Sequence, residues 1–158
     1  AQTLVERKGV LQSPMAHARE HSLEVQLPFL QRVLGDFSIV PLVVGQATVD
    51  EMASVFEFLW GGPETLFVVS TDLSHYLPYR EAVAADAITV DRIVGYELNE
   101  LDSDCACGAC PLRGFLAAAA EHQLKVVPLD IRNSADTAGS KDRVVGYGAF
   151  VLVETGIV

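Results

Sequence analysis

The chain has 158 residues, half of them hydrophobic, which suits one globular domain over residues 1–158 with a substantial core. Its formal net charge of −10 argues against nucleic acid or an anionic membrane surface as the main partner. No apolar run approaches the roughly 20 residues that span a bilayer, so we expect no membrane-spanning helix.

The first part of the chain predicts two helices. Residues 1–8 carry no initiator Met and no basic segment followed by an apolar one. We therefore expect the inside of a helix rather than a signal peptide, in a fragment or a processed product. Residues 22–34 predict the next helix, with Ser22 as a candidate N-cap and Pro28 at a kink or division.

A βαβ unit is predicted next. Apolar residues recur at helical spacing over residues 49–60, and Gly61 follows, which is typical of a helix and its end. Apolar segments at 37–44 and 66–70 flank this helix. Because a strand, a helix and a strand in this order form a right-handed crossover, we expect the two strands to be parallel.

The second half predicts two helices followed by two strands: residues 80–97, 111–122, 124–131 and 144–153. Pro111 is placed at the first position of its helix, where proline is favoured. The long polar loop 133–142 leaves a strand end and is a candidate site loop. We expect an α/β fold, a three-layer sandwich with a mostly parallel sheet and residues 144–153 as an antiparallel strand at an edge.

Asp72 and His75 are the first candidate site residues. They follow the buried strand expected at Phe67–Val69, and ligands in open α/β sheets bind beyond the carboxyl ends of strands. Asp and His bind metals or transfer protons near neutral pH. The alternative is structural, with Asp72 as a cap or turn residue and His75 as a half-buried imidazole with its hydrogen bonds satisfied.

Cys107 is the second candidate, because with Gly108 it ends a loop and precedes a helix. Thiols at helix N-termini are good nucleophiles and metal ligands. A buried, inert thiol is the alternative, and so is a reversible disulfide with Cys105 or Cys110. Three cysteines clustered between positions 105 and 110 are not a secreted disulfide framework, and they favour the reducing cytoplasm. The lone C-x-x-C pair has no second ligand pair for zinc.

Two further motifs are weaker candidates. Glu20, His21 and Glu24 open a predicted helix, where they form a capping cluster or, alternatively, place His21 or Glu24 in the same pocket as His75. Asn133 and Asp136 fit an Asx-type turn, and the loop that carries them is the reason to consider them as supporting pocket residues.

The motifs Glu20–Leu30, Val69–Tyr76, Cys107–Gly108, Asn133–Asp136 and Val144–Tyr147 occur in this order over almost the whole chain. Together they resemble the Memo-like family, the B component of a trio that also includes a radical-SAM protein and an AMMECR1-like protein. The resemblance implies a fold similar to that of class III extradiol dioxygenases, which use non-haem Fe(II). It also implies a pocket lined by histidines and a cysteine, and the other two members of the trio as partners.

The resemblance carries over to individual residues. His75 matches the histidine after the strand-end aspartate, as an acid/base or metal ligand, and Asp72 matches the nearby acid. Cys107 matches the pocket cysteine, a metal ligand. The family's other pocket histidines lie ahead of the first motif, so this chain resembles the C-terminal half to two-thirds of a family member. A missing N-terminal strand and helix would leave a sheet edge uncovered and favour self-association.

Three functions follow as hypotheses. The first is a dioxygenase-like oxidoreductase that uses iron, or copper because a thiolate ligand softens the site. The second is a non-catalytic adaptor that recognises a peptide or a partner protein with the same pocket. The third is a thiol enzyme with Cys107 as nucleophile and His75 as base.

Overall fold

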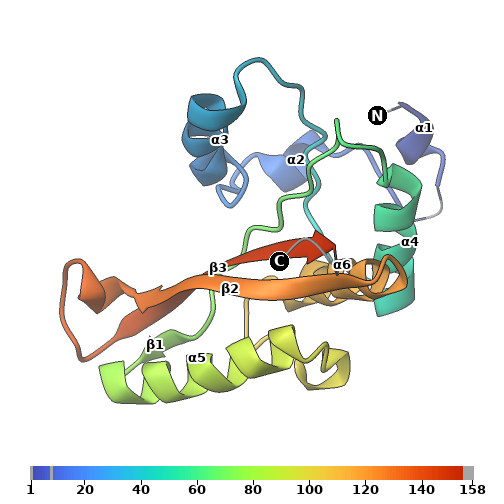
Figure 1. Ribbon diagram of the computed structural model, residues 1–158. Coiled ribbons are helices and arrows are strands. Elements are labelled where there is room, and N and C mark those ends of the chain that lie inside the picture. Colours follow the sequence, from blue (N-terminus) through green and yellow to red (C-terminus); the bar gives the residue numbers. More distant parts are fainter. Residues whose placement is uncertain (1, 8, 155–158) are drawn as a thin grey trace. The chain divides into compact units, whose positions relative to one another are not determined.

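The computed structural model describes residues 2–7 and 9–154 (Figure 1). Contacts along the chain divide it into two compact units, Ala1–Gly45 and Gln46–Val158. The single domain expected over residues 1–158 stays a prediction. In the described part of the chain, no helix is long and apolar enough to cross a membrane.

The N-terminal unit holds short helices. They are α1 (Gln2–Val5), α2 (Pro14–His17), a 3-10 helix (Glu24–Gln26) and α3 (Leu27–Leu34). The division predicted at Pro28 is confirmed, since Pro28 takes the second position of α3, where its missing N–H costs no hydrogen bond. Ser22 is not an N-cap. Leu23 precedes the 3-10 helix, and the Ser22 N–H donates to Glu20 Oε1 at 2.8 Å.

Three longer helices belong to the C-terminal unit. The helix predicted over 49–60 is α4 (Val49–Leu59), and Thr48 and Glu51 start it with a capping box. The helix predicted over 80–97 is α5 (Tyr79–Val94), and a 3-10 turn (Leu98–Glu100) follows it. The last is α6 (Ala109–Glu121), which begins before Pro111, so the proline is its third residue rather than its first.

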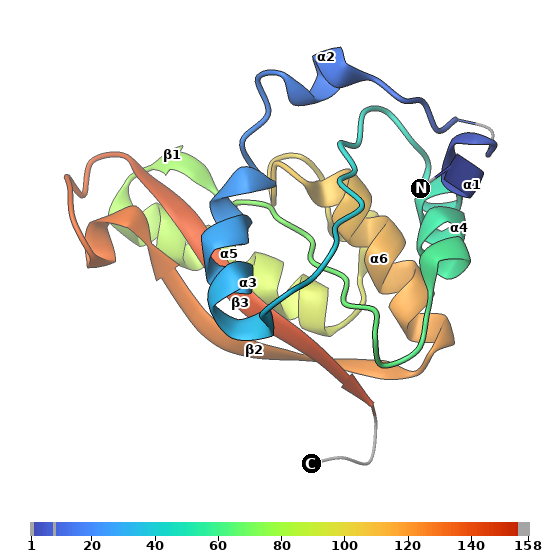
Figure 2. The same cartoon turned by 90° about the horizontal axis from the view of Figure 1, so that it is seen from above.

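The sheet differs from the one predicted. Its strands are β1 (His75–Leu77), β2 (Leu124–Asn133) and β3 (Val144–Glu154), in the order β1-β3-β2 (Figures 1 and 2). Both pairings are antiparallel, so the described strands do not form a mostly parallel sheet, and β3 is central rather than at an edge. The reason is local, because β2 and β3 are neighbours in sequence and pair as a hairpin.

The two flanking strands of the predicted βαβ unit are not formed. Residues 37–44 and 66–70 have no regular secondary structure in the described part of the chain. Leu66 is 62% exposed and Val68 is 46% exposed. An apolar, β-branched segment becomes a strand only where a partner completes its hydrogen bonds, and composition does not specify that partner.

The core of the C-terminal unit lies between the sheet, α5 and α6. Ile93 of α5, Leu116 of α6 and Val126 of β2 meet there, together with Leu73, Leu101 and Cys105. Leu73 lies two residues before β1 and anchors the segment that leads into it. The buried core therefore fixes the chain between Asp72 and His75.

Candidate functional site

Asp72, His75 and Cys107 converge in the C-terminal unit. Asp72 lies in the segment before β1, His75 is the first residue of β1, and Cys107 directly precedes Gly108, the N-cap of α6. One carboxylate oxygen, one imidazole nitrogen and the thiol sulfur all lie within 4.8 Å of one another. The sequence singles out these three residues, and the fold places them together.

The cluster is open to solvent. Asp72 Oδ2 lies 3.5 Å from His75 Nε2, and the two side chains are 48% and 38% exposed. A substrate or an ion can therefore reach all three groups without a movement of the core. At this separation the carboxylate can orient the imidazole.

The sulfur of Cys107 is held by the segment that carries Asp72. The backbone N–H of Asp72 donates to Cys107 Sγ at 3.3 Å, and Thr71 Oγ1 lies 3.4 Å from the same atom. Thr71 Oγ1 also accepts from the Gly108 N–H at 2.7 Å. A Cβ at Gly108 would come within 2.8 Å of the Thr71 side chain, so glycine permits this close approach. Thr71 is not among the site residues predicted from the sequence, although the hydroxyl pair Ser70–Thr71 directly precedes Asp72.

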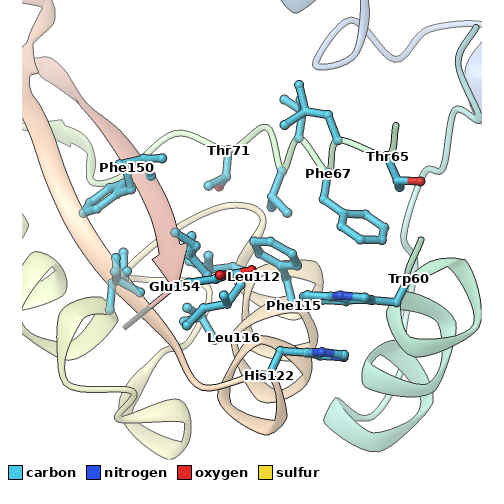
Figure 3. Close-up of a pocket in the computed structure, with 18 of the residues that line it drawn as sticks. Trp60, Thr65, Phe67, Thr71, Leu112, Phe115, Leu116, His122, Phe150 and Glu154 are labelled. Carbon is cyan, nitrogen blue, oxygen red and sulfur yellow. The ribbon is translucent and has the colours of Figure 1, made fainter. Parts of the chain in front are cut away.

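An apolar groove of about 890 Å³ adjoins the cluster at Thr71, which also lines the groove (Figure 3). Its walls are the segment that contains Phe67, helix α6 and the end of β3, and both Phe115 and Phe150 line it. At its rim the His122 ring stacks on Trp60 with centroids 3.8 Å apart. The polar cluster thus lies beside a surface that suits apolar groups.

Comparison with known proteins agrees with this arrangement of motifs. The model of the Memo-like protein family matches residues 1–151. The chain belongs to the Memo-like family.

Three curated relatives, each named as a MEMO1 family protein, illustrate the relationship. The chain is 35% identical over 144 residues to one from Sulfolobus acidocaldarius, covering 84% of this chain and 51% of the relative. It is 36% identical over 159 residues to one from Aeropyrum pernix, covering 92% and 57%. It is 36% identical over 149 residues to one from Aquifex aeolicus, covering 87% and 56%. The chain thus spans about half the length of the curated relatives that it matches.

The donor set of this Memo-like chain fits a transition-metal ion. A carboxylate, an imidazole and a thiolate are three protein ligands of types that iron, copper and zinc accept. Three protein ligands would leave coordination positions open for a substrate. A thiolate stands where the usual non-haem iron triad has a second histidine, which makes the site softer.

Cys105 and Cys110 make structural contacts, and all three cysteines are free thiols. Cys105 is buried, and its sulfur accepts from Arg92 Nη1 at 3.1 Å. Cys110 Sγ donates to the carbonyl of Ala47 at 3.3 Å. The alternative of a disulfide between Cys107 and either neighbour is therefore not realised in this structure.

Asn133 and Asp136 form a capping box at the turn after β2, as the Asx-type reading of the sequence predicts. Asp136 Oδ2 accepts from the Asn133 N–H at 2.8 Å, and Oδ1 accepts from the Tyr79 hydroxyl at 2.7 Å. The Asn133 N–H, followed by the Tyr79 hydroxyl, holds the pKa of the Asp136 carboxyl below its ordinary value. The same hydrogen bond to Asp136 raises the pKa of Tyr79.

His21 and Glu24 lie in the N-terminal unit, so a role for them in the pocket of His75 stays a prediction. Their neighbour Glu20 holds the turn before the 3-10 helix, which has no side-chain cap. Its Oε1 accepts from the backbone N–H groups of His21 and Ser22, both at 2.8 Å. The Ser22 hydrogen bonds, chiefly from its backbone, lower the pKa of the Glu20 carboxyl.

Proposed function

We propose that this Memo-like chain carries part of the metal centre of an iron-dependent, dioxygenase-like oxidoreductase. The observation that supports the proposal is the convergence of a carboxylate, an imidazole and a thiol within 4.8 Å at a solvent-open position. Family membership supports it as well, and the extradiol-dioxygenase-like sandwich of a complete family domain is part of the proposal. The chain spans about half of its relatives, so a complete centre would include ligands from the remaining part.

Each residue has a role in this proposal. Cys107 and His75 would hold the ion, and Asp72 would complete the set or orient the imidazole of His75 from 3.5 Å. When bound, a ferrous ion supplies a Lewis acid and electrons for the reduction of dioxygen. His75, if it is not a ligand, can hold or transfer a proton at Nε2. The Asp72 N–H and Thr71 position the sulfur of Cys107 through the contacts described above.

Metal binding and oxygen uptake test the proposal. The chain is titrated with Fe(II), or with Co(II) as a spectroscopic probe, and dioxygen consumption is followed on the full-length family protein. We expect Cys107→Ser and His75→Ala to weaken metal binding about tenfold or more, the range typical of lost ligands and their partners. Cys110→Ser is the matched control, since this thiol bonds to a backbone carbonyl. Equal metal binding by wild type and both variants, without oxygen consumption, would contradict the proposal.

A non-catalytic adaptor is the second candidate, and the open apolar groove favours it. Its partners would be an apolar peptide or the AMMECR1-like and radical-SAM proteins. Pull-down against these two proteins tests it with Leu66→Asp, because Leu66 lines the groove and is 62% exposed. Leu129→Asp is the control, since Leu129 is 65% exposed on β2 and is not among the residues that line the groove. Binding lost only with Leu66→Asp, without turnover, would favour the adaptor.

Location and assembly belong to the same proposal. The free thiols at 105, 107 and 110 fit the reducing cytoplasm. Self-association stays a prediction that light scattering tests, and a clean monomer would contradict it.

The thiol-enzyme hypothesis stays a prediction as well. It would be contradicted if the alkylation of Cys107 were as fast in His75→Ala as in the wild type.

A further inference from the structure

Asp86 is a buried carboxylate that the proposed metal centre does not use. It lies on α5 and is 3% exposed. Burial of a carboxylate without compensating hydrogen bonds is costly, so its partner is informative. That partner is the backbone N–H of Ser74, which donates to Asp86 Oδ1 at 2.9 Å.

The main chain around Ser74 is also held by the central strand. The Leu73 N–H donates to the Gly146 carbonyl at 2.9 Å, and the Gly146 N–H donates to the Ser74 carbonyl at 2.8 Å. A Cβ at Gly146 would collide with the carboxylate of Asp86, so glycine leaves the space that Asp86 occupies. Strand β3 therefore holds Leu73 and Ser74 through backbone bonds, and the side chain of Asp86 on α5 holds the N–H of Ser74.

Those two residues separate the candidate ligands. Leu73 and Ser74 connect Asp72 to His75. The chain must turn here, because the side chains of Asp72 and His75 lie 3.5 Å apart. The hydroxyl of Ser74 is buried and has no hydrogen-bond partner among the described residues. The backbone of Ser74, rather than its side chain, thus fixes the course of this turn.

We infer that Asp86 is a positioning residue, whose buried carboxylate fixes the turn between Asp72 and His75 by accepting the Ser74 N–H. The inference rests on the proposed metal centre for its functional meaning. The hydrogen bond, by contrast, can be measured without any metal. A bond to a charged acceptor is about twice as strong as a neutral one, so a carboxylate holds the turn better than an amide would.

Two substitutions of Asp86 weaken its hydrogen bond with the Ser74 N–H to different extents. Asp86→Leu keeps the branching and the number of side-chain heavy atoms and removes the acceptor, whereas Asp86→Asn keeps a neutral acceptor. The matched controls are Asp91→Leu and Asp91→Asn, since Asp91 lies on the same helix with an exposed side chain. Two quantities are measured on the full chain: the exchange rate of the Ser74 amide proton by NMR, and the affinity for Co(II) from the thiolate-to-metal absorption band.

We expect the Ser74 amide to exchange faster in Asp86→Asn and fastest in Asp86→Leu, with no change in either Asp91 variant. Co(II) affinity should fall about tenfold or more in Asp86→Leu, as for other residues that orient ligands, and by a smaller factor in Asp86→Asn. A change in the Co(II) absorption spectrum distinguishes a displaced ligand set from a general loss of stability.

Several outcomes would overturn the inference. One is an unchanged Ser74 exchange rate in a folded Asp86→Leu. Another is an unchanged Co(II) affinity in that variant together with faster exchange of the Ser74 amide proton. The turn would then not determine the positions of the ligands. If Asp86→Leu does not fold, Asp86→Asn decides, and wild-type values for both quantities would overturn the inference. A wild-type chain that binds no Co(II) would contradict the proposed metal centre, and Ser74 exchange alone would then decide whether Asp86 fixes the turn.

Discussion

Thr71 connects the two chain segments that supply the candidate ligands. Its hydroxyl accepts from the Gly108 N–H at the start of α6 and lies 3.4 Å from Cys107 Sγ. Its own backbone directly precedes Asp72. One short side chain thus links residues 36 and 37 positions apart in sequence and keeps the sulfur beside the carboxylate.

The lowered pKa of Asp136 predicts how the stability of the fold depends on pH. Its folded-state pKa lies below the ordinary 3.8, chiefly because it accepts the Asn133 N–H. A carboxyl with a lowered pKa stabilises the fold fully above its unfolded pKa, and this stabilisation is lost as the pH falls through the folded value. We expect Asp136→Asn to lower Tm near neutral pH, with the difference from wild type shrinking as the pH falls below 3.8. Calorimetry over a pH series measures this, and a constant difference down to the lowest pH would contradict it.

At the scale of elements, α4 and α6 pack most closely where Gly114 faces Met52. A Cβ at Gly114 would collide with the Met52 side chain and come within 3.1 Å of the Ala53 backbone nitrogen. Phe56 and Phe115 continue this interface with ring centroids 5.0 Å apart. The glycine therefore sets the distance between the two helices, and α6 in turn positions Cys107.

Gly114→Ala tests this packing. Alanine is the better helix former by about 1 kcal/mol, so the exposed interior of a helix would gain stability from the change. Here we expect the opposite sign, a loss of about 1–3 kcal/mol in the free energy of unfolding, because the added methyl group overpacks the interface. Urea denaturation measures it, and a variant at least as stable as wild type would show that the helices separate at little cost.

The helices were predictable from sequence because their apolar spacing and end residues are local properties. The capped helix at Val49 and the division at Pro28 are examples. The pairing of strands is not local: residues 66–70 have the composition of a buried strand, yet they form no strand in the described part of the chain, and Leu66 is exposed. The strand that carries site residues starts at His75 instead, where Val145 supplies a partner.

The distinction between local patterns and contacts of distant segments also applies to the candidate site. Asp72, His75 and Cys107 could be singled out by residue type and by their place at element ends. Their convergence depends on contacts between distant segments, such as that of Thr71 with Gly108, which no local pattern encodes. Asp86 was missed because a single Asp inside a helix is usually exposed.

At the scale of the whole molecule, the two compact units differ in what they carry. The three candidate ligands, Asp86 and the groove all belong to Gln46–Val158. In the described residues of Ala1–Gly45, Leu4 is the one buried side chain, whereas Phe29 and Val33 of α3 are more than two-thirds exposed.

This division predicts the behaviour of a shortened chain. Because all three candidate ligands and their hydrogen-bond partners lie beyond Gly45, we expect residues 46–158 to bind Co(II) within about threefold of the full chain, a difference below 1 kcal/mol. Parallel titrations of the two chains measure this. A much larger loss of affinity in a folded 46–158 would show that the N-terminal unit contributes to the centre.

The β2–β3 hairpin bears on the order in which the C-terminal unit folds. Its pairing joins residues that are close in sequence, from Asn133 with Gly146 outward to Leu124 with Glu154, so little chain entropy is lost when it closes. The meeting of Asp72 with Cys107 and of His75 with Val145 closes much longer loops. We therefore expect the ligands to come together after the hairpin has formed. An ion bound by them would then stabilise a nearly complete fold rather than start its formation.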